Sequence, residues 1–237
     1  MSFLKAEWRK LILVNYEVDE YILKPFVPKG TELDQWNQTH YISLVGFMFV
    51  NTKLLGVKIP WHTNFEEVNL RFYVRYKDGG EWKRGVVFIK EIVPRAALTF
   101  VANTLYKEHY VTLPMQHLWE EKADRRLVRY EWKCQQQHQF VEVESKLARV
   151  AILPNSEEEF ITEHYWGYTK VNDSKTYEYE VTHPKWEIYP IIKHQMNVDF
   201  GLNYGKEFKD LNGLQPKSVF LAEGSEITVE GKKQIRI

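Results

Sequence analysis

The sequence has little that would support a disulfide framework, a metal centre or a membrane span. Its single cysteine, Cys134, has no partner for an intrachain disulfide, and one thiolate does not make a zinc site by itself. The eight histidines are scattered, without a recognised zinc spacing. No run approaches the roughly 18 apolar residues that a membrane-spanning helix needs. We therefore expect no metal ligation and no transmembrane helix.

An excess of charge of one sign is also missing, because Lys plus Arg and Asp plus Glu each number 32. Because a chain with no net charge does not attract polyanions over a distance, the sequence predicts no nucleic-acid or membrane partner. A local basic patch is still compatible with this composition. It has no G-x-S-x-G elbow, Walker loop or G-x-G-x-x-G fingerprint, so we expect no cofactor. Charges at Lys5, Glu7, Arg9 and Lys10 interrupt the first apolar residues, unlike a signal peptide. The expected location is cytoplasmic.

What the chain does have is aromatic side chains, which make up 15% of its residues and include 8 Trp and 14 Tyr. This composition favours β-structure and pockets with amphipathic walls. We expect strands over residues 8–16, 41–50, 65–76, 85–94, 127–134, 140–150, 177–181 and 186–192, and a hairpin over 218–237 with Gly224 at its turn. Short helices are expected after Asp19, over about 95–108, after Ser156 and after Asp199. The sum is a mainly antiparallel sheet that curls or closes.

The stretch 60–95 sets charged side chains into runs that otherwise suit a packed sheet. One face of the strand at 65–76 is apolar, and the other carries Glu67, Asn69, Arg71, Tyr73 and Arg75. That polar face is either a solvated surface held by ion pairs or the wet interior of a barrel, and periodicity does not choose between them. In the next strand Lys90 and Glu91 point to opposite sides. Each must meet an opposite charge or a water-filled cavity, or else lie where the strand leaves the sheet.

The segments HTNFEEVNLRFYVR (62–75), RGVVFIKEIVPR (84–95) and EHYWGYT (163–169) resemble the bacterial YqjF-like family, a domain of unknown function. The likeness extends over most of the chain, and the first of these segments is its most specific part. That family is similar in fold to acetoacetate decarboxylase. The resemblance therefore implies a single domain over residues 1–237, built as a mainly β cone or barrel of antiparallel strands that encloses a cavity and carries short flanking helices.

The resemblance also implies roles for particular residues. Arg9 precedes a Tyr-Glu-Val-Asp segment by the interval that separates an arginine from Tyr-x-Thr-Asp in the decarboxylase, and so it looks like the active-site arginine. The segment 65–67 is similar to a Tyr-x-Glu segment, which makes Glu67 the cavity carboxylate. At 113–116, Leu-Pro-Met-Gln stands where the decarboxylase has Phe-Pro-Lys-Lys. With Met115 at the place of the Schiff-base lysine, neither that nucleophile nor its activating neighbour is present.

The predicted site is a pocket for a small organic acid or ketone. Its catalytic candidates are Arg9, Glu67 and, if imine chemistry persists, Lys90; Arg9 would bind a carboxylate or carbonyl oxygen, and Glu67 would orient or deprotonate the ligand. The candidates for further ligand contacts are Asn69, Arg71, Tyr106, Met115, Tyr165 and Trp166. An enzyme without a Schiff base, a non-catalytic sensor or carrier, and a lyase that uses Lys90 stay open as alternatives. The sequence neither supports nor excludes a homo-oligomer.

Overall fold

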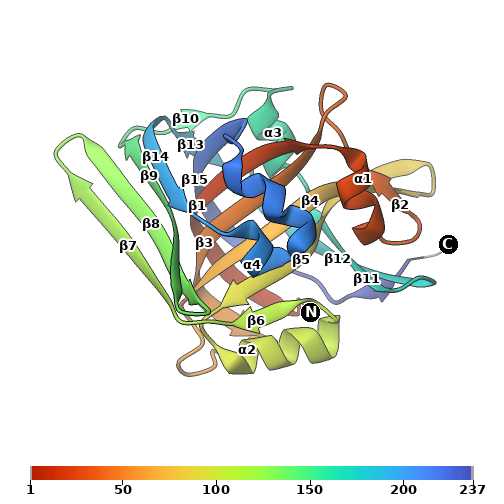
Figure 1. Cartoon of the computed structure of the whole chain (residues 1–237). Coiled ribbons are helices and arrows are strands. Elements are labelled where there is room, and N and C mark those ends of the chain that lie inside the picture. Colours follow the sequence, from red (N-terminus) through yellow and green to blue (C-terminus); the bar gives the residue numbers. More distant parts are fainter. Residues whose placement is uncertain (1, 236–237) are drawn as a thin grey trace.

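The computed structural model describes residues 2–235, apart from the side chains of Leu105 and Tyr106. The predicted ligand contact Tyr106 therefore has its side chain outside the described part of the chain. Most of the described residues lie in β-strands, and a few short helices sit around them (Figure 1). This confirms the expected mainly β architecture.

Within the described residues, seven strands pair edge to edge into a closed ring. Their order is β15 (Ser218–Val229), β1 (Leu4–Val18), β3 (His40–Leu54), β4 (Phe65–Asp78), β5 (Glu81–Val93), β11 (Trp166–Asn172) and β12 (Lys175–Thr182). The ring closes where Val181 of β12 lies opposite Val229 of β15. Neighbouring strands are antiparallel except β5 and β11, which run parallel. The closed ring agrees with the cone-like fold that the family resemblance implied.

The remaining elements lie at the ends and on the outside of the ring. The short strands are β2 (Thr31–Leu33), β6 (Tyr110–Thr112), β10 (Val150–Ala151), β13 (Glu187–Tyr189) and β16 (Lys233–Gln234). A second antiparallel sheet has the order β14 (Ile191–Asn197), β9 (Gln137–Lys146), β8 (Arg125–Cys134) and β7 (Met115–Lys122). The helical segments are α1 (Glu20–Leu23), η1 (Lys24–Phe26), α2 (Ala96–Val101), η2 (Ala102–Tyr106), α3 (Glu157–Thr162), α4 (Phe200–Tyr204) and η3 (Lys206–Gly213). Among the described helices, none has the length and apolar character that crossing a membrane requires.

Side chains alternate along each ring strand, so the buried apolar residues form two separate cores, one outside the ring and one inside it. On β4, Val68, Leu70 and Phe72 point outward into an apolar layer that the second sheet and α4 cover. Glu67, Asn69 and Arg71 point into the ring, where they are buried. The polar face of β4 is therefore interior rather than solvated. Further along the same face, Arg75 lies at the surface and pairs with Glu32.

Predicted helix starts agree with the structure, whereas the C-terminal hairpin does not. The Ser156 hydroxyl accepts a hydrogen bond from the Glu159 amide at 3.2 Å, and the Asp199 carboxylate accepts one from the Leu202 amide at 3.0 Å. The prediction of a turn at Gly224 is wrong, because β15 continues through it from Ser218 to Val229. Gly224 has a φ of +79° within the strand. The glycine marks a close approach between two strands instead of a reversal of the chain.

Candidate functional site

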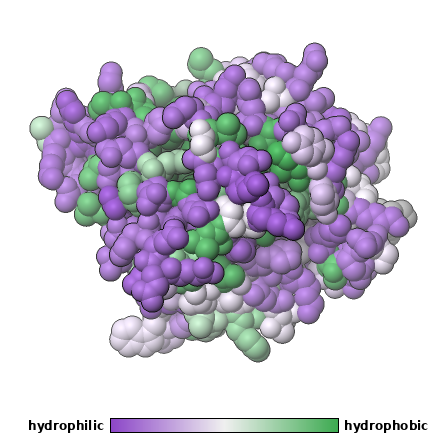
Figure 2. Space-filling model, in the orientation of Figure 1, coloured by the Kyte–Doolittle hydropathy of each residue, from purple (hydrophilic) through white to green (hydrophobic). Residues whose placement is uncertain are grey.

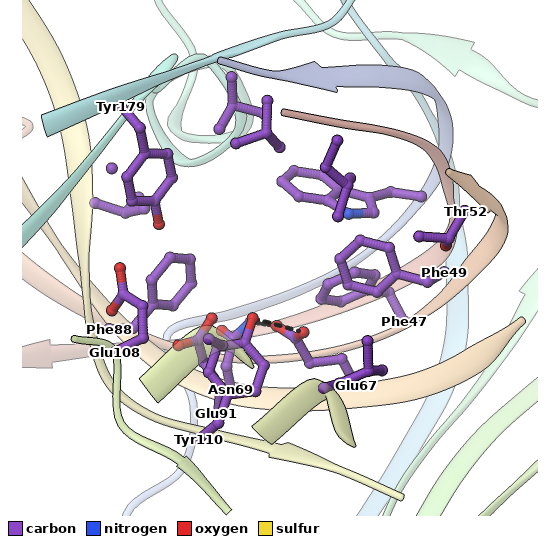
Figure 3. A pocket seen from close by; sticks show the side chains of 18 of the residues that line it. Phe47, Phe49, Thr52, Glu67, Asn69, Phe88, Glu91, Glu108, Tyr110 and Tyr179 are labelled. Atoms are coloured by element: carbon purple, nitrogen blue, oxygen red, sulfur yellow. Dashed lines mark hydrogen bonds between the residues drawn. The ribbon is translucent and has the colours of Figure 1, made fainter. Parts of the chain in front are cut away.

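The ring encloses a cavity of about 210 Å³ with mainly apolar walls (Figure 3). The aromatic part of the wall includes Trp8, Phe47, Phe49, Phe65, Phe88 and Trp186. These side chains come from β1, β3, β4, β5 and the segment before β13, and they face inward because alternate residues of each strand do so. A concave, apolar chamber with a few polar groups is typical of a site for a small molecule.

The polar part of the wall gathers carboxyl groups from different elements. Glu67 comes from β4, Glu91 from β5 and Glu108 from the turn between η2 and β6, and all are buried. Asn69 Nδ2 donates to Glu67 Oε1 at 2.9 Å, and the Tyr110 hydroxyl donates to Glu67 Oε2 at 3.3 Å. Figure 3 shows Glu67, Asn69, Glu91 and Tyr110 grouped on one side of the cavity. The hydrogen bonds fix the orientation of the Glu67 carboxyl group.

Glu108 lies nearby with hydrogen-bond partners of its own. The Thr169 hydroxyl donates to Glu108 Oε1 at 2.6 Å, and Tyr179 also hydrogen-bonds its carboxyl group. Gly167 on β11 leaves the space that the Tyr179 ring occupies, since a Cβ on Gly167 would lie 2.1 Å from that ring. Figure 3 shows Tyr179 extending toward Glu108. A glycine on one strand therefore makes room for the hydroxyl group that reaches the carboxyl group.

Burial, together with repulsion from neighbouring carboxyl groups at Glu67 and Glu91, raises the pKa values of these groups. Burial raises the pKa of Glu67 to about 7 and that of Glu108 to about 7, and the nearby Glu108 raises the Glu67 value further. Burial, with Glu108 and Glu67 close by, raises the pKa of Glu91 well above its usual range. The cavity can therefore offer both a proton donor and a proton acceptor near neutral pH, as proton-transfer sites do.

Because the pKa of Glu67 is raised, replacing Glu67 by glutamine should change how the free energy of unfolding depends on pH. Between the ordinary value of 4.5 and about 7, the folded protein holds a proton that the unfolded chain has lost. This contribution to stability is complete below the unfolded pKa and is lost as the pH rises through the folded pKa. The Glu67→Gln variant has no proton to lose at this position, so its stability does not show this decrease with rising pH. We expect the unfolding free energy of the variant, relative to the parent, to rise by about 2 kcal/mol between about pH 5 and pH 8.

Urea unfolding at a series of pH values measures this difference. The control is Glu226→Gln, which changes an exposed carboxyl group on β15. A Glu67→Gln curve that stays parallel to the parent across the range would contradict the raised pKa.

Arg71 places a buried positive charge in the same cavity. Arg71 is 7% exposed, and its Nη2 donates one long hydrogen bond, of 3.4 Å, to the Ile161 carbonyl oxygen. Its Nε is buried without a hydrogen-bond partner, and among the described residues no carboxylate oxygen lies within 4 Å of its guanidinium. A desolvated guanidinium is costly without an anionic partner. Arg71 is therefore suited to bind a carboxylate that enters the cavity.

A histidine and an aspartate meet at the wall next to Arg71. His164 Nε2 lies 3.1 Å from Asp34 Oδ2, and Arg84 Nε donates to the same oxygen at 2.7 Å. Burial opposes ionisation of Asp34, but hydrogen bonds from His164 and Arg84 outweigh it and hold the pKa of Asp34 below its usual range. Burial lowers the pKa of His164 to about 4, so its imidazole is neutral at pH 7. With Nε2–H donating to Asp34, His164 Nδ1 is left as a buried acceptor without a partner.

Two of the predicted catalytic residues lie outside this cavity. On β1, Trp8 and Leu11 face inward, and a bulge turns the intervening Arg9 to the outside, where Nη2 lies 2.6 Å from Glu7 Oε2. The expectation that Arg9 shares the enclosed space with Glu67 is corrected accordingly. Lys90 lies on the opposite face of β5 from Glu91, and its Nζ donates to the Asn203 carbonyl oxygen. Its ammonium group is therefore directed away from the cavity.

The other predicted contacts divide between the cavity and its surroundings. Asn69, Arg71 and Trp166 line the cavity together with Glu67. Met115, at the start of β7, packs against the layer between the ring and the second sheet. Tyr165 donates its hydroxyl proton to Glu163 and is not among the lining residues of the described chain.

The sequence analysis missed several polar groups of the wall, including Glu108, Tyr110, His164 and Tyr179. A signal for two of them was present. Glu108 and Tyr110 are two residues apart in the segment that follows the predicted helix, and this spacing places both on the same side of an extended chain. The segment that leaves this helix thus contributes to the cavity at residues 108–110, not at Met115.

The architecture is shared with solved structures of low sequence identity. The enduracididine biosynthesis enzyme MppR, solved in complex with pyruvate, is 14% identical with a TM-score of 0.69, over 99% of this chain and 91% of that one. Acetoacetate decarboxylase from Legionella pneumophila is 12% identical with a TM-score of 0.66, over 98% of this chain and 87% of that one. At these identities the likeness establishes the fold, which is that of the acetoacetate decarboxylase-like proteins.

Sequence comparison then identifies the family. The chain belongs to the DUF2071 family, described as an uncharacterized conserved protein, which matches residues 5–226. The uncharacterized protein YqjF of Bacillus subtilis (strain 168) is 30% identical over 114 residues, or 48% of this chain. The match covers 46% of that curated relative, less than half of its length.

Proposed function

We propose that the cavity binds a small, largely apolar organic acid, with the ligand carboxylate at Arg71 and the adjoining carbon atoms beside Glu67. The observation that carries this proposal is Arg71 itself, a buried guanidinium that lines an apolar chamber and has no carboxylate of the described chain within 4 Å. A carboxylate ligand would supply the missing partner through two parallel hydrogen bonds. MppR, which has the same fold, was solved with pyruvate, a small keto acid, and this supports the choice of ligand class.

The reaction type that fits the site is proton transfer at a carbon or oxygen close to the bound carboxylate. Glu67 has a pKa raised to about 7, so at neutral pH it can donate or accept a proton. The described residues that line the cavity include no lysine, and a Schiff base with a ketone needs such an amine. We therefore favour isomerase, lyase or hydrolase chemistry that proceeds without an imine.

A non-catalytic carrier or sensor is the second candidate. Its support is the set of hydrogen bonds by which Asn69 and Tyr110 satisfy Glu67, and Thr169 satisfies Glu108. Polar groups that satisfy one another in this way can simply hold the walls of a binding chamber in place.

Calorimetric titration tests the ligand class. The probes are straight-chain carboxylates and 2-keto acids of about four to ten carbon atoms, each paired with the primary alcohol of the same length. We expect each acid to bind at least about tenfold more tightly than its alcohol, because only the acid pairs with Arg71. Equal affinities would contradict the proposal. For a 2-keto acid that binds, loss of the NMR signal of its C3 protons in D₂O, faster than without protein, would support catalysis, and an unchanged signal would support the carrier.

A further inference from the structure

One end of the cavity lies between the loop that joins β3 to β4 and helix α2. Leu54 at the end of β3 and Ile59 and His62 of the loop line the cavity together with Ala97 and Leu98 of α2. Ile59 and Ala97 are also exposed, so the cavity reaches the surface between these two segments. Figure 1 shows the β3–β4 loop and α2 at the bottom of the molecule. We call this place the mouth of the cavity.

The mouth is surrounded by exposed apolar side chains, which we call the apolar rim. It consists of Leu55, Val57, Ile59 and Trp61 on the loop and Phe100 on α2, of which Trp61 is 85% and Phe100 71% exposed. Figure 2, in the same orientation, shows pale and green side chains at the bottom of the molecule. Single exposed apolar residues are ordinary, but a cluster around the opening of an apolar cavity indicates an interaction surface.

Cations on the loop and in the residues that flank the loop, α2 and η2 make the mouth locally basic. Lys53, Lys58, Arg95 and Lys107 are exposed, and none has a carboxylate of the described chain within 4 Å. The sequence has no Asp or Glu over 51–64 or over 92–107. The first carboxylate after the loop in the sequence, Glu66, is paired with His117 at 2.6 Å, and Glu7, which accepts a hydrogen bond from Asn51 Nδ2 at 2.8 Å, is paired with Arg9 at 2.6 Å. Although the chain has no net charge, its cavity thus opens through a basic and apolar surface.

We propose that the apolar rim docks on an anionic lipid bilayer, and that the cavity exchanges an apolar acid with that bilayer through its mouth. Tryptophan favours the boundary between headgroups and acyl chains, and adjacent lysines and arginines are attracted to anionic headgroups. A second copy of the chain suits this surface less well, because a two-fold contact would bring the same unpaired cations together. The docking stands on the rim and its charges alone, whereas the exchange step rests on the proposed function.

Co-sedimentation of the full chain with vesicles tests the docking. The probes are vesicles of phosphatidylcholine alone and vesicles in which about a quarter is phosphatidylglycerol. We expect binding to the anionic vesicles that weakens with added salt, and about tenfold weaker binding to the neutral ones. Trp61→Ser should weaken binding to the anionic vesicles about tenfold, and the double change Lys53→Glu with Lys58→Glu should abolish the preference for them.

Matched controls separate the rim from the rest of the surface. Trp82→Ser removes another exposed tryptophan, at the β4–β5 hairpin, and Lys133→Glu with Lys146→Glu makes the same change of net charge on the second sheet. Both controls should bind like the parent. Rim variants that bind like the parent, or a parent that does not prefer anionic vesicles, would overturn the proposal. A Trp61-dependent dimer in ultracentrifugation without vesicle binding would assign the rim to self-association.

The same preparation distinguishes the two proposals. If vesicles bind but no carboxylate probe binds by calorimetry, the docking stands and the proposed ligand fails. If carboxylates bind and vesicles do not, the ligand stands and the docking fails.

Discussion

Replacing Gly224 by alanine is expected to lower the free energy of unfolding by about 4 kcal/mol. The φ of Gly224 is +79°, a conformation that costs a residue with a Cβ roughly 1–2 kcal/mol. The added Cβ would also lie 2.0 Å from the Trp8 carbonyl oxygen and 2.7 Å from Leu11 Cδ1. A backbone oxygen cannot move aside as a side chain does, so β15 must shift away from β1 at about 1–3 kcal/mol more.

Urea unfolding of the two proteins measures this loss. The control is Gly213→Ala, because a Cβ on Gly213 meets no atom within 4 Å and its φ lies outside the left-handed region. The control should stay within about 0.5 kcal/mol of the parent. A loss of less than about 1 kcal/mol in Gly224→Ala would contradict the close approach of the two strands.

The faces of the ring strands could be predicted, but their closure could not. The alternation along β4 correctly separated Val68 and Leu70 from Glu67 and Asn69. Whether the polar face was interior depended on the pairing of Val181 with Val229, which joins strands far apart in sequence. No local pattern encodes such a contact, and so periodicity alone left the inside and the outside of the sheet undecided.

The turn prediction at Gly224 failed because a glycine has more than one structural use. Glycine between two apolar runs is typical of a hairpin, and it is equally suited to a strand that another backbone approaches closely. The Trp8 carbonyl that decides the matter belongs to the opposite end of the chain. Only the pairing of β15 with β1 shows that Gly224 serves a close approach of two strands and not a turn.

The location of candidate residues in the cavity could be predicted where they share one strand and not where they come from different ones. Glu67, Asn69 and Arg71 occupy alternate positions of β4, and so one strand assignment placed them all. Arg9 was placed from a sequence interval, which does not register the β-bulge beside it. His164 and Asp34 are 130 residues apart and meet only in the folded chain.

Replacing Arg71 by methionine is expected to weaken carboxylate binding roughly 100-fold, or about 3 kcal/mol, with little effect on the matched alcohols. Methionine preserves most of the apolar stem and removes the planar set of donors that pairs with a carboxylate. Because the guanidinium is buried with no carboxylate oxygen of the described chain within 4 Å, its removal relieves a desolvation cost. We therefore expect the unfolding free energy of the ligand-free variant to be equal to or higher than that of the parent.

Arg75→Met is the matched control, since Arg75 lies four residues further along the same face of β4 and pairs at the surface with Glu32 at 2.5 Å. Its binding of carboxylates should equal that of the parent. Calorimetry and urea unfolding of both variants separate a ligand-binding role from a structural one, because a structural arginine would lose stability on substitution and leave affinity intact. An Arg71→Met protein that unfolds more readily and still binds carboxylates like the parent would show that the buried charge supports the ring rather than the ligand.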